Sequence, residues 1–404
     1  MSAADPALPA VEGGAPLRAT PMPLRRALGP DERRLLDEAI RHYVDSGQDP
    51  GYRGPYQERY EKAFADSLGG GYAEAVATGT SALFVAVAAL ELPKGSEVLV
   101  SPVTDPGTLS AIVLNGLVPR LVDSARDSWN VDAASVAAAL GPNVRGAVLV
   151  HAAGQAFAAD AIAPLLKQRG IKLCEDASQS HGAACAGRPI GTFGDVAAYS
   201  TMYRKASITG GSGGVVYTRD RAVYERVMLH ADRGKPRWRE GFDWRDPAGF
   251  EVPALNHNTD ELSCAIGIAS IGRLADTIAR RLAYVKAVHA GLAARAKACY
   301  GHPWTEGDSP FVYPVHVRPG VLRIGKAEFA RALAAEGIGN NPDYRYVVAE
   351  WPYIRPHLAP TNGTPNATAM REGCFQLYVN ENYGPQEAED TVAAILKLER
   401  HYAA

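Results

Sequence analysis

A single lysine, Lys205, stands between the strand-like run VAAYS and a glycine-rich turn, GGSGG. Most lysines are solvated surface charges, and that reading stays open for Lys205. A lysine that holds a carbonyl compound as an imine must instead lie near the carboxyl edge of a sheet, with its amine partly desolvated. Ser200, at the end of the same run, could donate a hydrogen bond to a phosphate oxygen.

An acidic segment, EDASQSHG, directly follows the strand-like run IKLC. A carboxylate in this position, such as that of Asp176, can pair with a cationic ring nitrogen. Gln179 lies three residues further on and could hydrogen-bond a ring substituent. The alternative is that Asp176 only caps a strand-to-loop turn.

A third strand end reads TGTSA, where an apolar strand gives way to a helix. Gly79 lets the backbone turn tightly, so the free N–H groups of Thr80 and Ser81 are expected to point out of a helix N-terminus, which suits a phosphate. A Thr-Ser pair is also an ordinary helix N-cap, and this alternative stays open.

The elements that must position these residues alternate in type. Short strand-like and helix-like runs follow one another from Tyr72 to about Thr218. This alternation predicts βαβ units and a mostly parallel sheet covered by helices, with ligands collected beyond the carboxyl ends of the strands. A helical stretch is expected from Thr259 to about Leu292, and the alternating runs after it predict a second, smaller α+β domain.

The order of the three segments is more specific than any one of them. A phosphate turn, then Asp176, then Lys205 29 residues later, is the arrangement of fold type I pyridoxal-phosphate enzymes. The chain resembles the DegT/StrS-type sugar aminotransferases over nearly its full length. The segments that carry the resemblance are GYRGPYQERYEKAFA, ATGTSAL, VPRLVD, VHAAGQ, EDASQSHGA, GTFGDVAAYS, the Lys205 region, GGVVYT and NHNTDELSCAIG.

The resemblance implies an aspartate-aminotransferase-like α/β fold, with a mostly parallel seven-stranded sheet in a large domain and a smaller α+β C-terminal domain. It implies that pyridoxal 5'-phosphate is held as an imine (Schiff base) on Lys205, which then shuttles protons. It further implies that Asp176 pairs with the pyridine nitrogen and that Gln179 contacts the ring oxygen.

The resemblance also implies how the phosphate is bound. Thr80, Ser81 and Ser200 hold it at the turn that Gly79 makes possible, and Asn256 matches an asparagine that reaches the phosphate from the neighbouring subunit. A homodimer with shared active sites follows from that match.

The chain departs from the family pattern at three places. Asp105 stands where an aromatic residue usually covers the cofactor ring, so either a nearby residue covers that face or the substrate end differs. Asn258 replaces an arginine, and Tyr203, followed by Arg204, replaces a proline. None of these removes the essential chemistry, and Tyr203, Arg204 and Asn258 are themselves candidates for substrate contacts.

Two other groups are candidates for the substrate end. The loop from Arg233 to Arg245 contains Arg237, which could bind a nucleotide diphosphate or a sugar carboxylate, unless the loop is a solvated surface. His151 and His181 lie near strand ends. A satisfied structural histidine is the favoured interpretation of each, although His151 could approach the ring face that lacks an aromatic residue.

Composition limits the classes of partner. With 47% hydrophobic and 21% charged residues the chain has an ordinary soluble globular composition, and a net charge of -2 gives no field for nucleic acid or an anionic membrane. Five scattered cysteines without a CxxC pair predict neither a zinc site nor disulfides, so no metal is expected. The N-terminus lacks the features of a signal peptide, so we expect a cytoplasmic protein with a loose leading arm.

We therefore predict an N-terminal arm over 1–30, a large cofactor-binding domain over 31–258, and a linking helix with the small domain over 259–404. The predicted function is transfer of an amino group from an amino acid, first of all glutamate, onto a keto-sugar in amino-sugar biosynthesis. A nucleotide-linked keto-hexose is the leading acceptor, and a free keto-sugar acid of the octulosonate type and a keto-cyclitol stay open.

The rival functions are a pyridoxal-phosphate sugar dehydratase and a cofactor-binding regulator. Lys205 counts against the dehydratase, because such relatives typically have histidine there. The complete set of Asp176, Gln179 and Lys205 counts against a regulator, which needs no carbanion chemistry. A nicotinamide-dependent oxidoreductase is disfavoured, since no GxGxxG follows an early strand.

Overall fold

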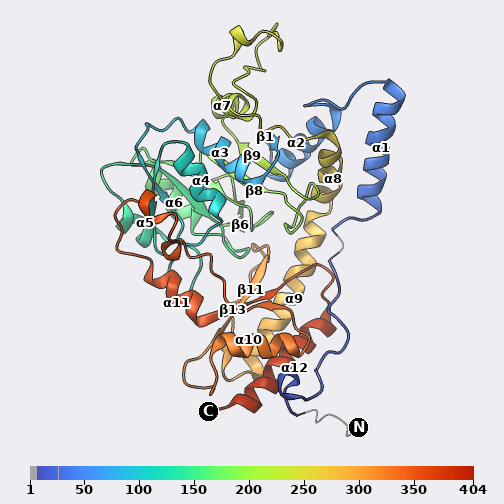
Figure 1. Cartoon of the computed structure of the whole chain (residues 1–404), viewed down its shortest axis with the longest axis vertical. Coiled ribbons are helices and arrows are strands. Elements are labelled where there is room, and N and C mark those ends of the chain that lie inside the picture. Colours follow the sequence, from blue (N-terminus) through green and yellow to red (C-terminus); the bar gives the residue numbers. More distant parts are fainter. Residues whose placement is uncertain (1–6, 26) are drawn as a thin grey trace.

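The computed structural model describes residues 7–25 and 27–404, so the predicted arm is described except for residues 1–6 and 26, which lie outside that range. In Figure 1 the large domain occupies the upper part of the molecule, and the small domain, with the C-terminus, the lower part.

A seven-stranded sheet forms the centre of the large domain, in the order β1-β9-β8-β5-β4-β2-β3. Its strands are β1 (Tyr72–Val76), β2 (Glu97–Val100), β3 (Val118–Leu121), β4 (Val144–Val150), β5 (Lys172–Asp176), β8 (Val196–Ser200) and β9 (Gly214–Thr218). Neighbours from β8 to β3 are parallel, whereas β9 is antiparallel to both β1 and β8. The prediction of a mostly parallel seven-stranded sheet is confirmed.

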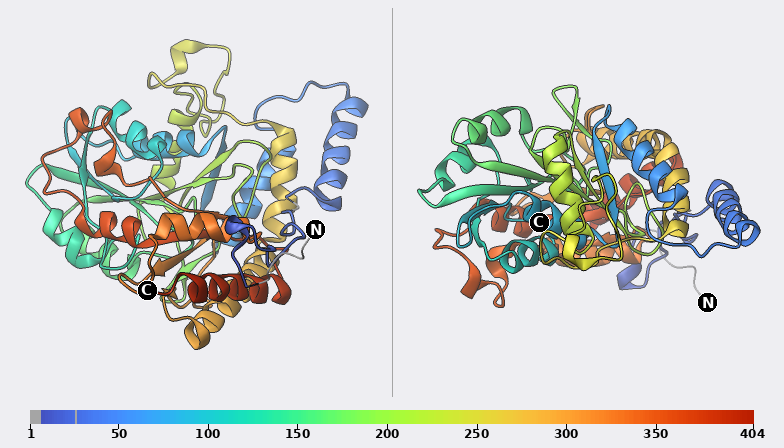
Figure 2. Two further views of the ribbon diagram at one scale, coloured as in Figure 1. Left: turned by 60° about the horizontal axis from the view of Figure 1, so that its bottom comes forward. Right: turned by 90° about the horizontal axis from the view of Figure 1, so that it is seen from above.

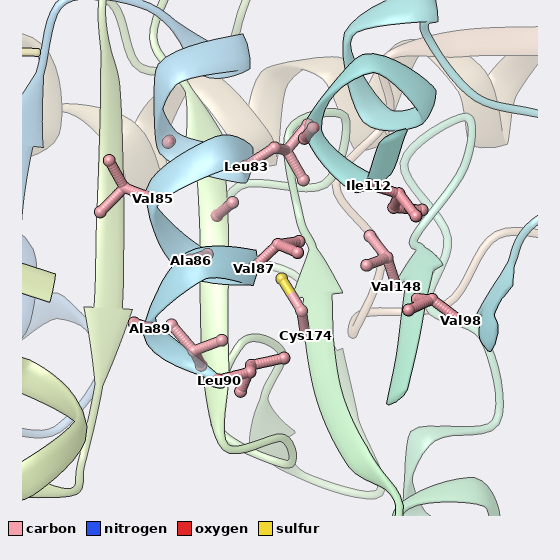
Figure 3. Packing of buried hydrophobic residues seen from close by; sticks show 14 of the residues in the cluster. Leu83, Val85, Ala86, Val87, Ala89, Leu90, Val98, Ile112, Val148 and Cys174 are labelled. Carbon is pink, nitrogen blue, oxygen red and sulfur yellow. The ribbon is translucent and has the colours of Figure 1, made fainter. Parts of the chain in front are cut away.

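Helices cover both faces of this sheet. They are α2 (Pro55–Ser67), α3 (Gly79–Ala89), α4 (Pro106–Leu114), α5 (Ala133–Ala139), α6 (Ala159–Lys167) and α7 (Arg221–Ala231), with α1 (Pro30–Ser46) and α8 (Glu261–Gly272) at one side. On one face, Leu83 and Val87 of α3 pack on Val148 and Cys174 of the strands (Figure 3). On the other face α5 and α6 cover Leu99. The strands are apolar on both sides because both sides are buried.

The small domain is built on a four-stranded antiparallel sheet in the order β10-β11-β13-β12. Its strands are β10 (Cys299–Tyr300), β11 (Val312–Val317), β12 (Asn340–Asn341) and β13 (Cys374–Tyr378), and its helices are α9 (Leu274–Arg295), α10 (Lys326–Ala335), α11 (Pro365–Gly373) and α12 (Pro385–Tyr402). Phe329 and Phe375 lie at 0% exposure in its core. The predicted smaller α+β domain is therefore present.

The short elements complete the chain. They are the hairpin strands β6 (Ala184–Cys185) and β7 (Arg188–Pro189), and the 3-10 helices η1 (Ala10–Glu12), η2 (Pro247–Gly249), η3 (Val348–Glu350) and η4 (Arg355–His357).

The large and small domains do not separate cleanly at Thr259, the predicted start of the linking helix. The expected single helical stretch is two helices, α8 and α9, which meet at Arg273 with a bend of 55°. Helix α8 packs on α1 and α2 of the large domain. A later segment returns as well, because Val348 and Ile354 join the apolar cluster around α3. The small domain thus shares a broad contact with the face that carries α3.

The described part of the leading arm is not loose, contrary to our expectation. It runs along the small domain (Figures 1 and 2), where the N–H of Leu17 donates to Glu336 at 2.8 Å. Arg18 pairs with Glu387 of α12 at 2.9 Å. Among residues 7–25 and 27–404, no single helix is long and apolar enough to cross a membrane, and the bent pair of α8 and α9 passes that test only jointly.

Candidate active site

Lys205 lies in the turn after β8, where its N–H donates to the carbonyl of Met202 at 2.9 Å. The side chain is partly buried, and its Nζ lies 4.8 Å from the ring centroid of Phe311, just before β11. Burial lowers the pKa of the Lys205 amine, while the carboxylates of Asp176 and Asp105 act in the opposite direction. A larger share of unprotonated amine follows, as a lysine that attacks a carbonyl requires.

Asp176 is the last residue of β5 and is 3% exposed. Its Oδ1 accepts a hydrogen bond from the N–H of Ser178 at 3.1 Å, and its Oδ2 accepts one from the hydroxyl of Thr108 at 3.3 Å. Burial raises the pKa of Asp176, and the Ser178 hydrogen bonds oppose that shift. In the part of the chain that the structure describes, this buried carboxylate forms no ion pair, so a cationic ligand nitrogen fits beside it.

Thr108 is a site residue that the sequence analysis missed. It lies on α4 at 0% exposure, and its hydroxyl also lies 2.6 Å from the hydroxyl of Thr104. The two threonines, which follow β2 two strands away from β5, therefore support the carboxylate of Asp176. The only signal in the sequence is the pair of threonines four residues apart just after a strand.

The start of α3 forms a cradle with the end of β8. A Cβ built on Gly79 would lie 2.5 Å from the Cβ of Ser200 and 2.8 Å from its Oγ, so only glycine allows this approach. Thr80 next to it is exposed. Gly107 makes a second close approach, since a Cβ there would lie 2.4 Å from Oγ1 of Thr80. This cradle fits a phosphate group at a helix N-terminus.

One detail of the predicted phosphate turn is wrong. The N–H of Ser81 is not free, because it donates to Oγ1 of Thr78, the N-cap of α3, at 2.8 Å. The Ser81 hydroxyl lies 3.1 Å from Nδ1 of His257. Among the described residues, Thr80 and Ser200 remain as the side chains of the cradle whose hydroxyls have no hydrogen-bond partner.

Gln179 is held from two sides. Its Oε1 accepts a hydrogen bond from the N–H of Ala153 at 2.8 Å, and its Nε2 donates to the hydroxyl of Tyr344 at 3.3 Å. Tyr344 stacks on Tyr346 with ring centroids 4.9 Å apart. Burial raises the pKa of Tyr344 to about 12, and the charge of Asp105 acts in the same direction. An aromatic side chain of the small domain therefore lies beside the site, from a segment that the sequence analysis did not single out.

Asp105 itself is exposed and caps α4, since its Oδ1 accepts the N–H of Gly107 at 2.9 Å. The position that the family gives to an aromatic ring is thus occupied by a helix N-cap.

His151 is a structural histidine, as the favoured interpretation predicts, and the alternative of a substrate contact is not supported. It is fully buried, its Nε2 lies 3.0 Å from Oε2 of Glu175, and its ring stacks on Phe157 at 4.1 Å. Successive side chains of a strand point to opposite faces, so Glu175 and its partner lie on the face away from Asp176. His151 is a satisfied structural histidine.

Arg237 is also not available as an anion-binding group. Its side chain is 2% exposed, and its guanidinium forms an ion pair with Glu74 of β1. Glu74 accepts a second ion pair, from Arg53 at 2.7 Å. The guanidinium of Arg237 is therefore held inside the large domain, away from solvent.

Four further predicted residues are partly or fully exposed in the single chain: Tyr203, Arg204, Asn256 and Asn258. His181, in contrast, is 2% exposed, and its Nε2 lies 2.9 Å from the carbonyl oxygen of Ser200. Tyr203 is 52% exposed, and the Arg204 guanidinium lies 5.5 Å from the centroid of its ring. Asn256 donates to the hydroxyl of Tyr52 at 3.3 Å and accepts from Nδ2 of Asn258 at 2.8 Å. Within residues 7–25 and 27–404, no group of three or more His, Cys, Asp or Glu side chains could hold a metal ion.

A partly buried lysine, a buried carboxylate on the neighbouring strand and a helix-end phosphate cradle together define a lysine-centred α/β enzyme site. The model of the DegT/DnrJ/EryC1/StrS aminotransferase family matches residues 30–396, and the chain belongs to this family. The predicted family, fold class and type of enzyme are confirmed.

Three known proteins show the likeness in more detail. A Streptoalloteichus tenebrarius protein, provisionally named L-glutamine:3-amino-2,3-dideoxy-scyllo-inosose aminotransferase, is 34% identical over 289 residues, 70% of this chain and 66% of that protein. GDP-perosamine synthase of Escherichia coli O157:H7 is 30% identical over 229 residues, 57% of this chain and 61% of the synthase. The chain thus matches slightly less than two thirds of the length of these relatives. The crystal structure of an aminotransferase from Psychrobacter cryohalolentis is 25% identical, with a TM-score of 0.84 over 93% of this chain and 98% of that one.

Proposed function

We propose that the chain is a pyridoxal-phosphate-dependent aminotransferase in which Lys205 carries the cofactor. One observation supports this assignment above the others: the desolvated amine of Lys205 lies in the field of the buried, otherwise uncompensated carboxylate of Asp176. When bound, the cofactor supplies an electron sink for the substrate carbon that loses or gains a proton. Replacement of Lys205 by alanine should abolish turnover, and near-normal rates in that variant would contradict the assignment.

The other side chains bind and orient the cofactor. Asp176 pairs with the pyridine nitrogen, and Thr108 holds the carboxylate in place through its hydrogen bond. Thr80 and Ser200 bind the phosphate in the cradle that Gly79 leaves open. Gln179 lies at the ring-oxygen end, and the amine of Lys205 moves the proton at the substrate carbon.

The acceptor is a keto-sugar, and the donor is an amino acid, with glutamate as our first choice. The relatives' names point to two acceptor classes, a nucleotide-linked sugar and a keto-cyclitol. Because Arg237 is paired with Glu74, one expected contact to a diphosphate is lost. This loss favours the keto-cyclitol as acceptor more than the sequence did. Assays with a nucleoside-diphosphate 4-keto-hexose and with scyllo-inosose separate the two, because the enzyme should aminate one of them at least a hundredfold faster.

We further propose a homodimer with shared active sites, located in the cytoplasm. Asn256 is exposed in the single chain, in keeping with a role toward a second subunit. Exposed apolar side chains nearby support an interface, because a monomer gains nothing from exposing them. They are Ile40, Val44, Tyr52, Leu255 and Leu262. All five cysteines are free thiols, as a reducing compartment would keep them.

A further inference from the structure

Arg25, in the leading arm, reaches the turn that bears Lys205. Its Nη1 donates a hydrogen bond to the carbonyl of Tyr203 at 3.0 Å, and its Nη2 donates to the carbonyl of Lys205 itself. Its Nε donates to Oε1 of Glu381 at 3.2 Å. One guanidinium therefore joins the backbone of the Lys205 turn to a carboxylate of the small domain.

The small domain holds this guanidinium firmly. Glu381 also accepts from Arg281 of α9 at 2.8 Å, and the Arg281 side chain is 2% exposed. The arm next to Arg25 is tied to the same segment, since the carbonyl of Leu24 accepts from Asn382 at 2.8 Å and that of Pro23 accepts from Asn380 at 3.0 Å. The backbone just before Arg25 is thus fixed to the small domain.

The turn has few other restraints. Besides the bond from Lys205 N–H to Met202, its ends are closed by the N–H of Thr201 to Gly213 and the N–H of Thr209 to Thr201, each at 2.9 Å. The hydroxyls of Thr201 and Thr209 lie 2.7 Å apart, and the N–H of Ile208 donates to Oγ of Ser270 on α8 at 2.9 Å. Hydrogen bonds from a charged donor are roughly twice as strong as neutral ones. Among the described residues, the two from Arg25 are the side-chain hydrogen bonds from outside the turn that reach the carbonyls of Tyr203 and Lys205, and the next external one lies at Ile208.

We propose that Arg25 is a positioning residue for Lys205, through which the leading arm becomes part of the active site. By holding the carbonyls of Tyr203 and Lys205, Arg25 fixes where the lysine side chain starts and couples that point to the small domain. This inference rests on the proposed function of Lys205. An error of about 1 Å in the placement of a reacting group can cost about a hundredfold in rate.

The test compares Arg25→Gln and Arg25→Lys with a matched control, Arg226→Gln. The Nε of Arg226 donates to the carbonyl of Ala89 at 2.7 Å, at the end of α3 opposite Gly79, so the control loses the same type of bond away from Lys205. Two quantities are measured on the full-length protein: the rate constant with which added pyridoxal phosphate forms its visible band with the lysine, and amide hydrogen exchange over residues 201–207 without cofactor.

We expect Arg25→Gln to lower that rate constant at least tenfold and to speed exchange in the turn at least tenfold, with Arg226→Gln close to wild type in both. Arg25→Lys should fall between them, because one ammonium cannot reach two carbonyls and Glu381 together. If both Arg25 variants match the control, the positioning role is overturned while the function of Lys205 stands. If the wild-type protein forms no band, the proposed function fails instead. The hydrogen-exchange data then still test whether Arg25 restrains the turn. Should Arg25→Gln not fold, Arg25→Lys decides by the same two readouts.

Discussion

Gly79 and Ser200 are in such close contact that a Cβ on Gly79 would lie 2.5 Å from the Cβ of the serine. Ser200 ends β8, and Gly79 begins α3, so this contact joins the strand that leads to Lys205 with the helix that receives the phosphate. The distance between the two elements is therefore set by the absence of one side chain.

Gly79→Ala should weaken binding of pyridoxal phosphate at least tenfold, because the added methyl must push the start of α3 away from Ser200. Titration of the cofactor-free protein, followed by visible absorption, measures this. Gly272→Ala is the matched control, since a Cβ on Gly272 would meet nothing within 4 Å. Equal affinities for the two variants would show that the cradle does not hold the phosphate.

Thr108→Val removes the hydroxyl that donates to Asp176 while keeping the shape of the side chain. We expect kcat to fall about tenfold and the free energy of unfolding to fall by about 1–3 kcal/mol, as for other buried polar groups that lose a partner. Thr391→Val is the control: its hydroxyl lies 3.0 Å from that of Tyr284 in the small domain, so stability should fall with kcat unchanged. A Thr108→Val enzyme with wild-type kcat would exclude a role for Thr108 in holding Asp176.

Part of this site could be predicted and part could not, for reasons visible in these residues. Asp176 ends an apolar strand, and Gly79 and Lys205 follow such strands within five residues. Because parallel strands end at one edge of the sheet, the local sequence pattern is enough to predict that these residues lie together. Thr108 looks like any helical threonine. Tyr344 and Arg25 reach the site only through packing of segments far away in the chain.

The two residues that were predicted as possible substrate contacts but lie elsewhere, His151 and Arg237, also have a physical explanation. A residue just after a strand can point to either face of the sheet, and His151 points to the face of Glu175. Arg237 belongs to a loop that was expected to bind an anion or to be solvated, yet its partner is Glu74 on a strand more than a hundred residues earlier. In the fold, the helical pattern across 259–292 was correct, but it could not reveal the bend at Arg273.

The lowered pKa of Lys205 predicts a pH-dependent stability of the cofactor-free protein. The unfolded chain holds the lysine proton up to the ordinary pKa of about 10.4, whereas the folded protein loses it earlier. The free energy of unfolding therefore rises with pH between the lowered pKa of the folded protein and the ordinary pKa of the unfolded chain. Below the lowered pKa the lysine is charged in both states, and burial of its ammonium group destabilises the folded protein.

Lys205→Met should consequently be more stable than wild type at pH 7, and its advantage should shrink as the pH approaches about 10.4. Urea unfolding of both proteins across this range measures the difference. The control is Lys62→Met, because the Lys62 side chain is 76% exposed and should give no comparable trend. A constant difference between wild type and Lys205→Met would mean that the amine is not desolvated.

Shared active sites predict complementation between two defective subunits. Lys205→Ala and Asn256→Ala homodimers should both be inactive or weak, but a mixed dimer contains one site with an intact Lys205 from one subunit and an intact Asn256 from the other. Random mixing after partial unfolding and refolding should restore up to about a quarter of wild-type activity, as half of the dimers are mixed and each has one good site of two. If mixing restores no activity, Asn256 acts in the active site of its own subunit or lies outside the active site.

The central claim is that Lys205 carries pyridoxal phosphate for amino-group transfer. The most direct measurement is the visible absorption spectrum of the purified protein with pyridoxal phosphate, recorded before and after glutamate and repeated with Lys205→Ala. The account predicts a band of the lysine-linked cofactor that glutamate bleaches to the amino form and that Lys205→Ala lacks. A wild-type spectrum without that band, or the same band in Lys205→Ala, would contradict it.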